Sequence, residues 1–364
     1  MRQLDRRSLL LAWSLLPFLT PAKKRILLAR FDPPESARET DAGFLSALLS
    51  IRRDEAAAVR DPAAVSPLMR QIASLGEEAI VLGDADYPPR LASICDPPLA
   101  IFVRGRRELA RADSIAVVGS RRASPYGENA ARRLASALSS RGIAVVSGMA
   151  RGVDAAAHRA ALGSPGGTVA VLGTGIDRTY PPEHRELRDA IAAGELLVTE
   201  FPPGAPPRRE HFPIRNRIIA GLSLGVVVIE AGEKSGSLIT ARLAAEEGRE
   251  VFAVPGSIFS RNSIGAHRLI QDGAKLAGSV EDILEEIGTL AVGARPAEPP
   301  REPMEPELAR VLDALSTDEG IAMDVAAAQL GVGIEWLAPR LLALELAGEV
   351  RALPGTRYII TAGS

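Results

Sequence analysis

Residues 114–163 contain two consecutive units of the same kind, each an apolar run, a turn of small residues and a helical segment. The turn residues of interest are Gly119, Ser120 and Arg121 in the first unit, and Ser147, Gly148 and Arg151 in the second. Such repetition is typical of a parallel sheet with crossover helices. Both turns then lie at the carboxyl ends of their strands, which is the edge where ligands bind.

The chemistry of these turns favours an anion. Backbone N–H groups at helix N-termini, together with nearby arginines, form a phosphate site. The dinucleotide fingerprint G-x-G-x-x-G is absent, and Ser147-Gly148 stands where a ribose-binding acid would end the second strand. Residues 233–235 lack the glycine loop of a Walker A motif. The alternative is that the glycines only permit tight turns.

The rest of the chain continues the alternation of apolar runs and helical segments up to residue 288. The expected strands are 168–172, 196–199, 226–229 and 250–254. The pattern predicts an α/β fold with an extended Rossmann-like, doubly wound and mostly parallel sheet over 81–288. Residues 99–103 are expected to be an edge strand. A small helical domain over 1–80 precedes this body, and a Pro- and Ala-rich linker, 289–306, follows it.

Two further segments could contact a nucleic acid. Residues 201–220 hold four arginines against the single acid Glu210, and Phe212 lies among them. Single-stranded nucleic acid needs cations for its backbone and a ring on which a base can stack. The alternative is that Phe212 is a core residue and that the arginines form a solvated face with no binding role. In the second segment, 235–240, hydroxyls enter a helix and either bind a phosphate or cap the helix.

The C-terminal residues 307–364 have the element order of a winged helix. We expect helices at 307–315, 323–330 and 334–347, and strands at 350–351 and 358–360. A winged helix usually binds duplex DNA in the major groove. This segment, however, carries eight acids and four bases, which gives 4 − 8 = −4. Because DNA phosphates would repel such a domain, we expect it to contact protein.

Composition excludes several classes of protein. The formal net charge is only −2, so any nucleic-acid binding depends on a local patch. The single cysteine, Cys95, excludes a disulfide framework, and the four histidines are scattered. We therefore expect neither a metal site nor a cofactor. Arg6-Arg7 before an apolar run is similar to a twin-arginine signal, but no small-residue cleavage site follows and we expect a cytoplasmic protein. No apolar stretch is long enough to span a membrane.

Several motifs in order resemble the DNA-processing protein A family, also called Smf. They are IAVVGSRRASPYG (115–127), SGMARGVDAAAH (147–158), GTGIDRTYPPEHREL (173–187), FPIRNRIIAGLS (212–223), SGSLITARLAAEEGR (235–249) and VFAVPG (251–256). The resemblance covers about 84–288. It implies a non-catalytic homodimer that binds single-stranded DNA, protects incoming DNA in natural transformation and helps load the RecA recombinase. An N-terminal domain of the SAM-like type and a C-terminal winged helix are common in the family.

The resemblance also implies roles for residues of this chain. Gly119, Ser120 and Arg121 would hold one phosphate, with a neighbouring contact from Ser147 and Gly148. Arg209 would be a backbone cation and Phe212 the base-stacking ring. The remaining groove residues would be Arg215, Asn216, Arg217, Ser237 and Thr240. We add Ser235 and Gly236 to the predicted phosphate-binding residues because they begin a helix. Arg151 is added because it lies in the second turn.

Two other functions remain open at this stage. A nucleotide or phosphoribosyl hydrolase would use Asp154, Glu200 or Glu230 as acid or base, since these residues end strands or begin helices near the site. Against it, Pro165-Gly166-Gly167 precedes a strand, where the loop of such hydrolases follows one. The other function is a nucleotide sensor that binds without turnover.

Overall fold

The computed structural model of the chain describes residues 5–61, 67, 70, 78–288, 305–315 and 320–361. Its centre is a nine-stranded sheet of order β1-β2-β6-β5-β4-β3-β7-β8-β9. The strands are β1 (Glu78–Val81), β2 (Ala100–Gly105), β3 (Ser114–Val118), β4 (Ala144–Ser147), β5 (Thr168–Val171), β6 (Leu196–Thr199), β7 (Gly225–Val228), β8 (Glu250–Ala253) and β9 (Lys275–Leu276). In this order, all neighbouring strands from β6 through β5, β4, β3, β7 and β8 to β9 pair in parallel. β2 pairs antiparallel with both β6 and β1.

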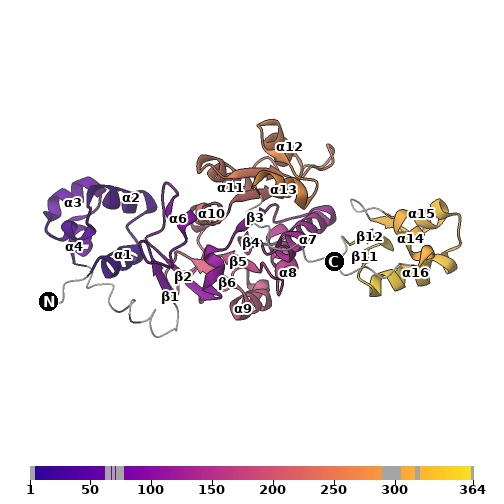
Figure 1. Cartoon of the computed structure of the whole chain (residues 1–364), viewed down its shortest axis with the longest axis horizontal. Coiled ribbons are helices and arrows are strands. Elements are labelled where there is room, and N and C mark those ends of the chain that lie inside the picture. The colour runs from indigo at the N-terminus through magenta and orange to yellow at the C-terminus, as the bar shows by residue number, and fades with distance from the viewer. Residues whose placement is uncertain are drawn as a thin grey trace.

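Helices cover both faces of this sheet (Figure 1). The helical segments between the strands are α6 (Pro89–Ala92), η3 (Arg107–Arg111), α7 (Pro125–Ser140), α8 (Val153–Ala161), η4 (Pro182–His184), α9 (Arg185–Gly194), α10 (His211–Leu222), α11 (Gly236–Glu246), α12 (Ile264–Gln271) and α13 (Val280–Glu286). Alternate residues of β3 serve the two layers, as the pleat of a strand dictates. Ile115 and Val117 pack with α7, α8 and α13, while Ala116 and Val118 pack with α10 and α11.

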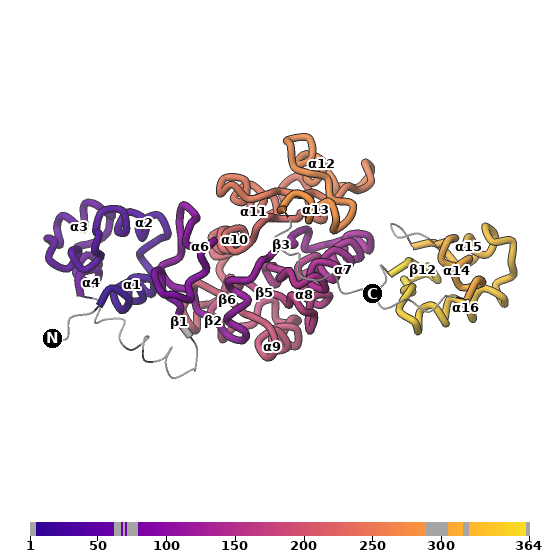
Figure 2. Tube along the Cα trace, viewed as in Figure 1, coloured from indigo at the N-terminus to yellow at the C-terminus, as the bar shows by residue number. Residues whose placement is uncertain are grey.

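The N-terminal helices form one core with the β1 side of the sheet. They are α1 (Arg6–Leu15), α2 (Pro21–Arg30), η1 (Pro34–Arg38), α3 (Ala42–Leu49) and α4 (Arg53–Arg60). Leu9 and Trp13 of α1 are fully buried in a cluster that also contains Phe102 of β2. The indole of Trp13 donates to the carbonyl of Val59 at 2.9 Å, which ties α1 to α4. Figure 2 shows these helices in indigo beside β1 and β2.

The C-terminal residues form a separate small core. Its elements are α14 (Pro306–Asp313), β10 (Ile321–Ala322), α15 (Met323–Leu330), α16 (Ile334–Leu346), β11 (Val350–Leu353) and β12 (Arg357–Ile360). Val311, Leu337 and Leu341 lie at its centre, and this cluster contains no residue from before 305 among those described. Two contacts join it to α7. Asn129 Nδ2 donates to the carbonyl of Ile360 at 2.8 Å, and Arg351 Nη1 lies 3.5 Å from Glu128 Oε2.

The predicted fold class is confirmed, with two differences. The expected edge strand at 99–103 is β2, which lies inside the sheet because β1 pairs with its outer side; that prediction was wrong. β1, β9 and β10 were not predicted. The predicted linker, 289–306, lies outside the described residues except for its last two positions. Within the described part of the chain, no helix has both the length and the apolar character that crossing a bilayer requires.

Candidate nucleic-acid interface

A pocket of about 770 Å³ opens at the carboxyl ends of β3 and β7. The chain winds from β3 to β6 in one direction and then returns to β7 on the other side of β3, so these two strands flank the topological switch point. Open α/β sheets bind ligands in the crevice at such a point. The pocket therefore lies at the edge of the sheet where the sequence analysis predicted a ligand site.

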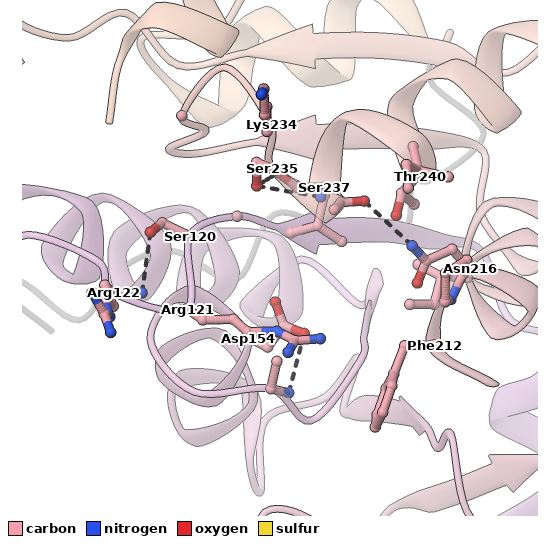
Figure 3. Close-up of a pocket in the computed structure, with 18 of the residues that line it drawn as sticks. Ser120, Arg121, Arg122, Asp154, Phe212, Asn216, Lys234, Ser235, Ser237 and Thr240 are labelled. Atoms are coloured by element: carbon pink, nitrogen blue, oxygen red, sulfur yellow. Dashed lines mark hydrogen bonds between the residues drawn. The ribbon is translucent and has the colours of Figure 1, made fainter. Parts of the chain in front are cut away.

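Eleven of the fifteen predicted binding residues line this pocket (Figure 3). They are Gly119, Ser120, Arg121, Arg209, Phe212, Arg215, Asn216, Ser235, Gly236, Ser237 and Thr240. The other four, Ser147, Gly148, Arg151 and Arg217, do not belong to the lining. DNA contact by any of these residues stays a prediction. The contacts within the protein show which side chains are exposed and which are buried and already bonded to other residues.

The first turn, 119–122, presents unpaired cations. A Cβ at position 119 would lie 2.6 Å from Cγ2 of Val153, so only glycine allows the turn to pack on α8. Ser120 Oγ accepts the N–H of Arg122 at 3.1 Å, which closes the turn. The guanidinium groups of Arg121 and Arg122 are exposed, and neither has a hydrogen bond or an ion pair to another described residue. Both are therefore available to a phosphate.

The N-terminus of α7 is already occupied by a carboxylate. Glu230, buried at the end of β7, accepts from the N–H and Oγ of Ser124 at 2.9 and 2.5 Å. The sequence had favoured phosphate binding by helix N-termini, but at α7 an internal acid binds the N-cap Ser124 and places a negative charge at the positive end of the helix dipole, while the N–H of Gly127 donates to Ser124 Oγ. Phosphate binding at the first turn must then depend on its two arginines and on the turn backbone.

Side chains of α8 hold the backbone of the second turn, 147–152. Asp154 Oδ2 accepts the N–H groups of Gly148 and Ala150, at 3.1 and 3.2 Å. His158 Nε2 accepts the N–H of Met149 at 3.3 Å. Ser147 is fully buried and its Oγ donates to the carbonyl of Val117. The predicted phosphate contacts of Ser147 and Gly148 are therefore not supported, because their polar groups are used inside the protein.

Arg215 supports this turn and is nearly buried. Its Nη1 donates to the carbonyl of Gly148 at 2.7 Å and also to that of Val171. Burial lowers the pKa of the Arg215 guanidinium to about 10, although the Asp154 carboxylate opposes the shift. Burial likewise raises the pKa of Asp154, against the effect of Arg215 and of the two N–H donors. Both groups reach the pocket wall, but each also holds the turn in place.

Two other predicted cations are paired elsewhere. Arg217 forms a two-pronged ion pair with the buried carboxylate of Glu200, at 2.6 and 2.8 Å, and faces the N-terminal helices rather than the pocket. Arg151 is paired with Glu183 of η4. These positions look like binding residues in the sequence because charge alone does not reveal an internal partner.

The helix α10 presents the predicted ring to the pocket. Phe212 lies in its first turn and is half-buried, and the Arg121 guanidinium carbon is 5.4 Å from the centre of its ring. Figure 3 shows the ring at the pocket wall below Asn216. The amide of Asn216 donates to the carbonyl of Gly236 at 3.3 Å, which joins α10 to the start of α11. The ring and the cation thus stand together, as the stacking of a charged strand requires.

The start of α11 forms the opposite wall. Ser235 is its N-cap, with Oγ near both the N–H and the Oγ of Ser237, at 3.4 and 2.8 Å. The side chain of Thr240 lies one turn further along the same helix and also lines the pocket. Lys234 is exposed and has no hydrogen bond or ion pair among the described residues. A helix N-terminus with an adjacent free ammonium group suits a second phosphate.

Sequence reasoning missed five polar or aromatic residues of the lining, one of them the acid Glu233. Arg122 and Lys234 belong to the two phosphate-type turns and could have been found as cations adjacent to predicted ones. Tyr180 and Asn262 come from other loops that the sheet brings to this edge. Counting the whole lining, five cations face two acids, which leaves 5 − 2 = +3. A pocket of this sign attracts anions although the chain as a whole is slightly acidic.

The three acids considered for hydrolysis all have internal partners. Glu230 caps α7, Glu200 pairs with Arg217, and Asp154 holds the second turn. Only Asp154 lies in the lining. Among the described residues, no group of three His, Cys, Asp or Glu side chains is arranged to hold a metal ion.

The fold and the pocket define a Rossmann-like protein with a cationic site at its switch point. A family model described as DNA recombination-mediator protein A matches residues 78–288, and one described as the DprA winged helix domain matches 295–356. The chain therefore belongs to the DNA recombination-mediator protein A family, whose members include the proteins called DprA and Smf.

Individual relatives agree with this assignment. Protein Smf of Escherichia coli is 43% identical over 275 residues, which is 74% of either chain. The DNA processing protein DprA of Streptococcus pneumoniae is 48% identical over 204 residues, 56% of this chain and 72% of that one. The X-ray structure of the S. pneumoniae protein superposes with a TM-score of 0.68 and covers 78% of this chain and 98% of that one, at 37% identity. A Helicobacter pylori DNA processing protein A structure, titled for its single-stranded DNA binding mode, has a TM-score of 0.53 at 27% identity and covers 58% and 95% of the two chains.

Proposed function

We propose that this protein binds single-stranded DNA in the pocket at the switch point and performs no chemistry there. The observation that carries the proposal is the contact between Arg121 and Phe212, at 5.4 Å, inside a cationic pocket. If Arg121 binds a phosphate of the strand, the base of the adjoining nucleotide would lie beside the Phe212 ring. Stacking on a ring does not distinguish one base from another, so we expect binding with little sequence preference.

Two phosphate positions suit the geometry. One lies at Ser120, Arg121 and Arg122, and the other at Lys234, Ser235 and Gly236, on opposite walls of the pocket (Figure 3). A strand with a phosphate on Arg121 would have a base within reach of Phe212, whose ring centre is 5.4 Å from that guanidinium. Duplex DNA fits this arrangement poorly, because its bases are paired and stacked on each other and are not free to stack on the protein. The relative from H. pylori, described by its title as a binder of single-stranded DNA, supports the same substrate class.

The test is a salt-titrated binding assay with single-stranded DNA, the matching duplex and a nucleoside monophosphate. We expect the single strand to bind tightest, and the logarithm of its affinity to fall linearly with the logarithm of salt concentration. Arg121→Ala should weaken binding on all sequences alike and reduce the salt slope by about one. Arg217→Gln is not a suitable control because that side chain is buried; Arg208→Ala, an exposed cation outside the lining, is the matched control.

Other outcomes would favour other functions. Tight binding of the monophosphate with weak binding of the strand would support a nucleotide sensor. Release of free base from the monophosphate would support a hydrolase. An Arg121→Ala protein that binds the single strand as the wild type does would overturn the proposed site.

Family membership supports a wider biological role. We propose that the protein acts in the cytoplasm as a homodimer in natural transformation, protects incoming single strands and helps load the RecA recombinase onto them. Light scattering measures the dimer directly. Recombinase loading is measured as RecA-dependent strand exchange on DNA already coated with single-strand binding protein. A monomer at all concentrations, or exchange that is unchanged by the protein, would contradict the respective part.

A further inference from the structure

Tyr180 is an aromatic residue of the pocket that neither the sequence motifs nor the comparisons assign. Its ring centre lies 5.3 Å from that of Phe212, and the two planes are inclined by 41°. Tyr180 is 37% exposed, so it is more open to solvent than the half-buried Phe212. The side chain lines the pocket, on a loop that comes from the end of β5 rather than from α10.

The Phe212 ring is enclosed by other groups. A Cβ at position 173 would lie 2.9 Å from Cδ1 and Cε1 of Phe212, so the ring rests on the bare backbone of Gly173. Tyr180 contacts it from another direction, and the Arg121 guanidinium stands 5.4 Å from its centre. Phe212 therefore offers a base only part of its surface.

The loop that carries Tyr180 is tied to its surroundings at three residues. Glu183 is paired with Arg151, and His184 Nδ1 is 3.1 Å from the carbonyl of Met149, so both bonds tie the loop to the second turn. On the other side, Asp177 Oδ1 accepts the N–H of Gly204 at 2.7 Å. A ring held by such a loop keeps its position before a ligand arrives, which reduces the entropy cost of binding.

From this geometry we infer that Tyr180 is a second base-stacking residue, so that the site holds two neighbouring unpaired bases, one against each ring. The inference rests on the proposed function and extends it from one base to two. The inclination of the rings matches two bases that are splayed apart rather than stacked on each other. The Arg151–Glu183 pair joins the loop of Tyr180 to the second turn.

The test separates base contacts from phosphate contacts. Affinity is measured for a short oligothymidylate and for an abasic strand of the same length, and the ratio of the two reports base stacking alone. The variants are Tyr180→Leu, Tyr180→Phe, Phe212→Leu and the double variant Tyr180→Leu/Phe212→Leu. Thermal unfolding checks that each is folded. Because only the ratio is interpreted, the result does not depend on the register in which the strand binds.

We expect Tyr180→Leu to reduce the ratio by about 5- to 150-fold, the range for the loss of one stacked base, and to leave the affinity for the abasic strand unchanged. Tyr180→Phe should keep the wild-type ratio within about threefold. The double variant should lose more than either single variant, and because the two rings are in contact its loss need not equal the product of the two single effects.

Three results would overturn the inference. Tyr180→Leu could bind oligothymidylate as the wild type does, or weaken both strands equally, or add nothing to Phe212→Leu, in which case Tyr180 only supports that ring. The failure of the proposed function gives a different pattern, since Arg121→Ala would then leave the affinity for both strands unchanged.

Discussion

At the scale of single residues, a buried histidine outside the pocket lining holds the backbone of the second turn. His158 is fully buried on α8 between the second turn and β5. Thr168 Oγ1 donates to the carbonyl of Val145 at 2.7 Å, so its oxygen must accept from His158 Nδ1, which is also 2.7 Å away. Nδ1 then carries the proton and Nε2 is left to accept the N–H of Met149. This tautomer, inferred from the hydrogen-bond network, satisfies every polar atom of a neutral ring.

A second proton on this ring would disrupt the network. Burial, with smaller effects from Arg215 and His184, lowers the pKa of His158 from 6.5 to about 3. A protonated Nε2 would also point its hydrogen at the N–H of Met149, which is another donor. The unfolded chain binds the proton below about pH 6.5 whereas the folded one does not, so stability is complete above that pH and is lost as the pH falls toward 3.

We therefore predict that the free energy of unfolding decreases by up to about 1.4 kcal/mol per pH unit below pH 6 through His158 alone. Urea unfolding at pH 7, 6 and 5, for the wild type and for His158→Gln, isolates this contribution as the difference between the two slopes. Asp154, whose raised pKa acts in the opposite sense, is common to both proteins and cancels. Parallel slopes for the two proteins would mean that His158 does not titrate in this way.

At the scale of elements, the N-terminus of α7 binds the carboxylate of Glu230, at a place where an external anion could otherwise bind. Ser124 is the N-cap and Pro125 the first helical residue, which the sequence indicates correctly. The sequence does not indicate that Glu230, more than a hundred positions later, covers the same helix end. A Cβ on Gly127 would lie 2.4 Å from Cδ of Glu230, so the carboxylate lies directly on the first turn of the helix.

Glu230→Gln should lower the free energy of unfolding by about 1–2 kcal/mol, because a neutral amide loses the charge-assisted bonds and the favourable interaction with the helix dipole. Chemical denaturation gives the value. Glu233→Gln is the matched control, since Glu233 is exposed on the pocket rim and has no hydrogen bond or ion pair to another described residue. If both variants had equal stability, the carboxylate of Glu230 would not be what stabilises the start of α7.

Elements with a strong local signal were predicted well, and those without one were not. The C-terminal helix 323–330 has the bounds expected from its apolar spacing and the glycine that follows it. β10 has two residues, which are too few to show a period, and β1 was missed although its four residues equal the length of strands that were predicted. The missing β1 is why β2 was mistaken for an edge strand.

At the scale of the whole molecule, the site is an assembly of turns that are distant in sequence. The sequence predicts Gly119, Ser120 and Arg121 because a strand, a glycine turn and a helix are adjacent there. Tyr180 reaches the same pocket because β5 ends at the same edge of the sheet, which follows only from the strand order. Local patterns likewise mark Arg217 as a cation without revealing Glu200, its buried partner.

Among the described residues, few contacts join the C-terminal domain to this assembly. Its core contains no described residue from the sheet, and its charge over 307–364 is 4 − 8 = −4. The ion pair between Arg351 and Glu128 is about one-third exposed on either side, and such pairs contribute about 0–1 kcal/mol. Asn129 adds a single hydrogen bond to the carbonyl of Ile360. The stability of the sheet domain therefore does not depend on this partner.

A chain that ends after Gly288 should bind single-stranded DNA within about threefold of the full-length affinity at physiological salt. The charges of the removed domain act only over a Debye length of about 8 Å, and the pocket keeps all of its lining residues, which lie between 118 and 262. Fluorescence anisotropy at two salt concentrations measures the change, and thermal unfolding checks that the shortened chain folds. Glu128→Gln in the full-length chain is the control, because it breaks the contact with Arg351 but keeps the domain. A more than tenfold loss in the shortened chain, without a loss in Glu128→Gln, would place the acidic domain on the path of the DNA despite its charge.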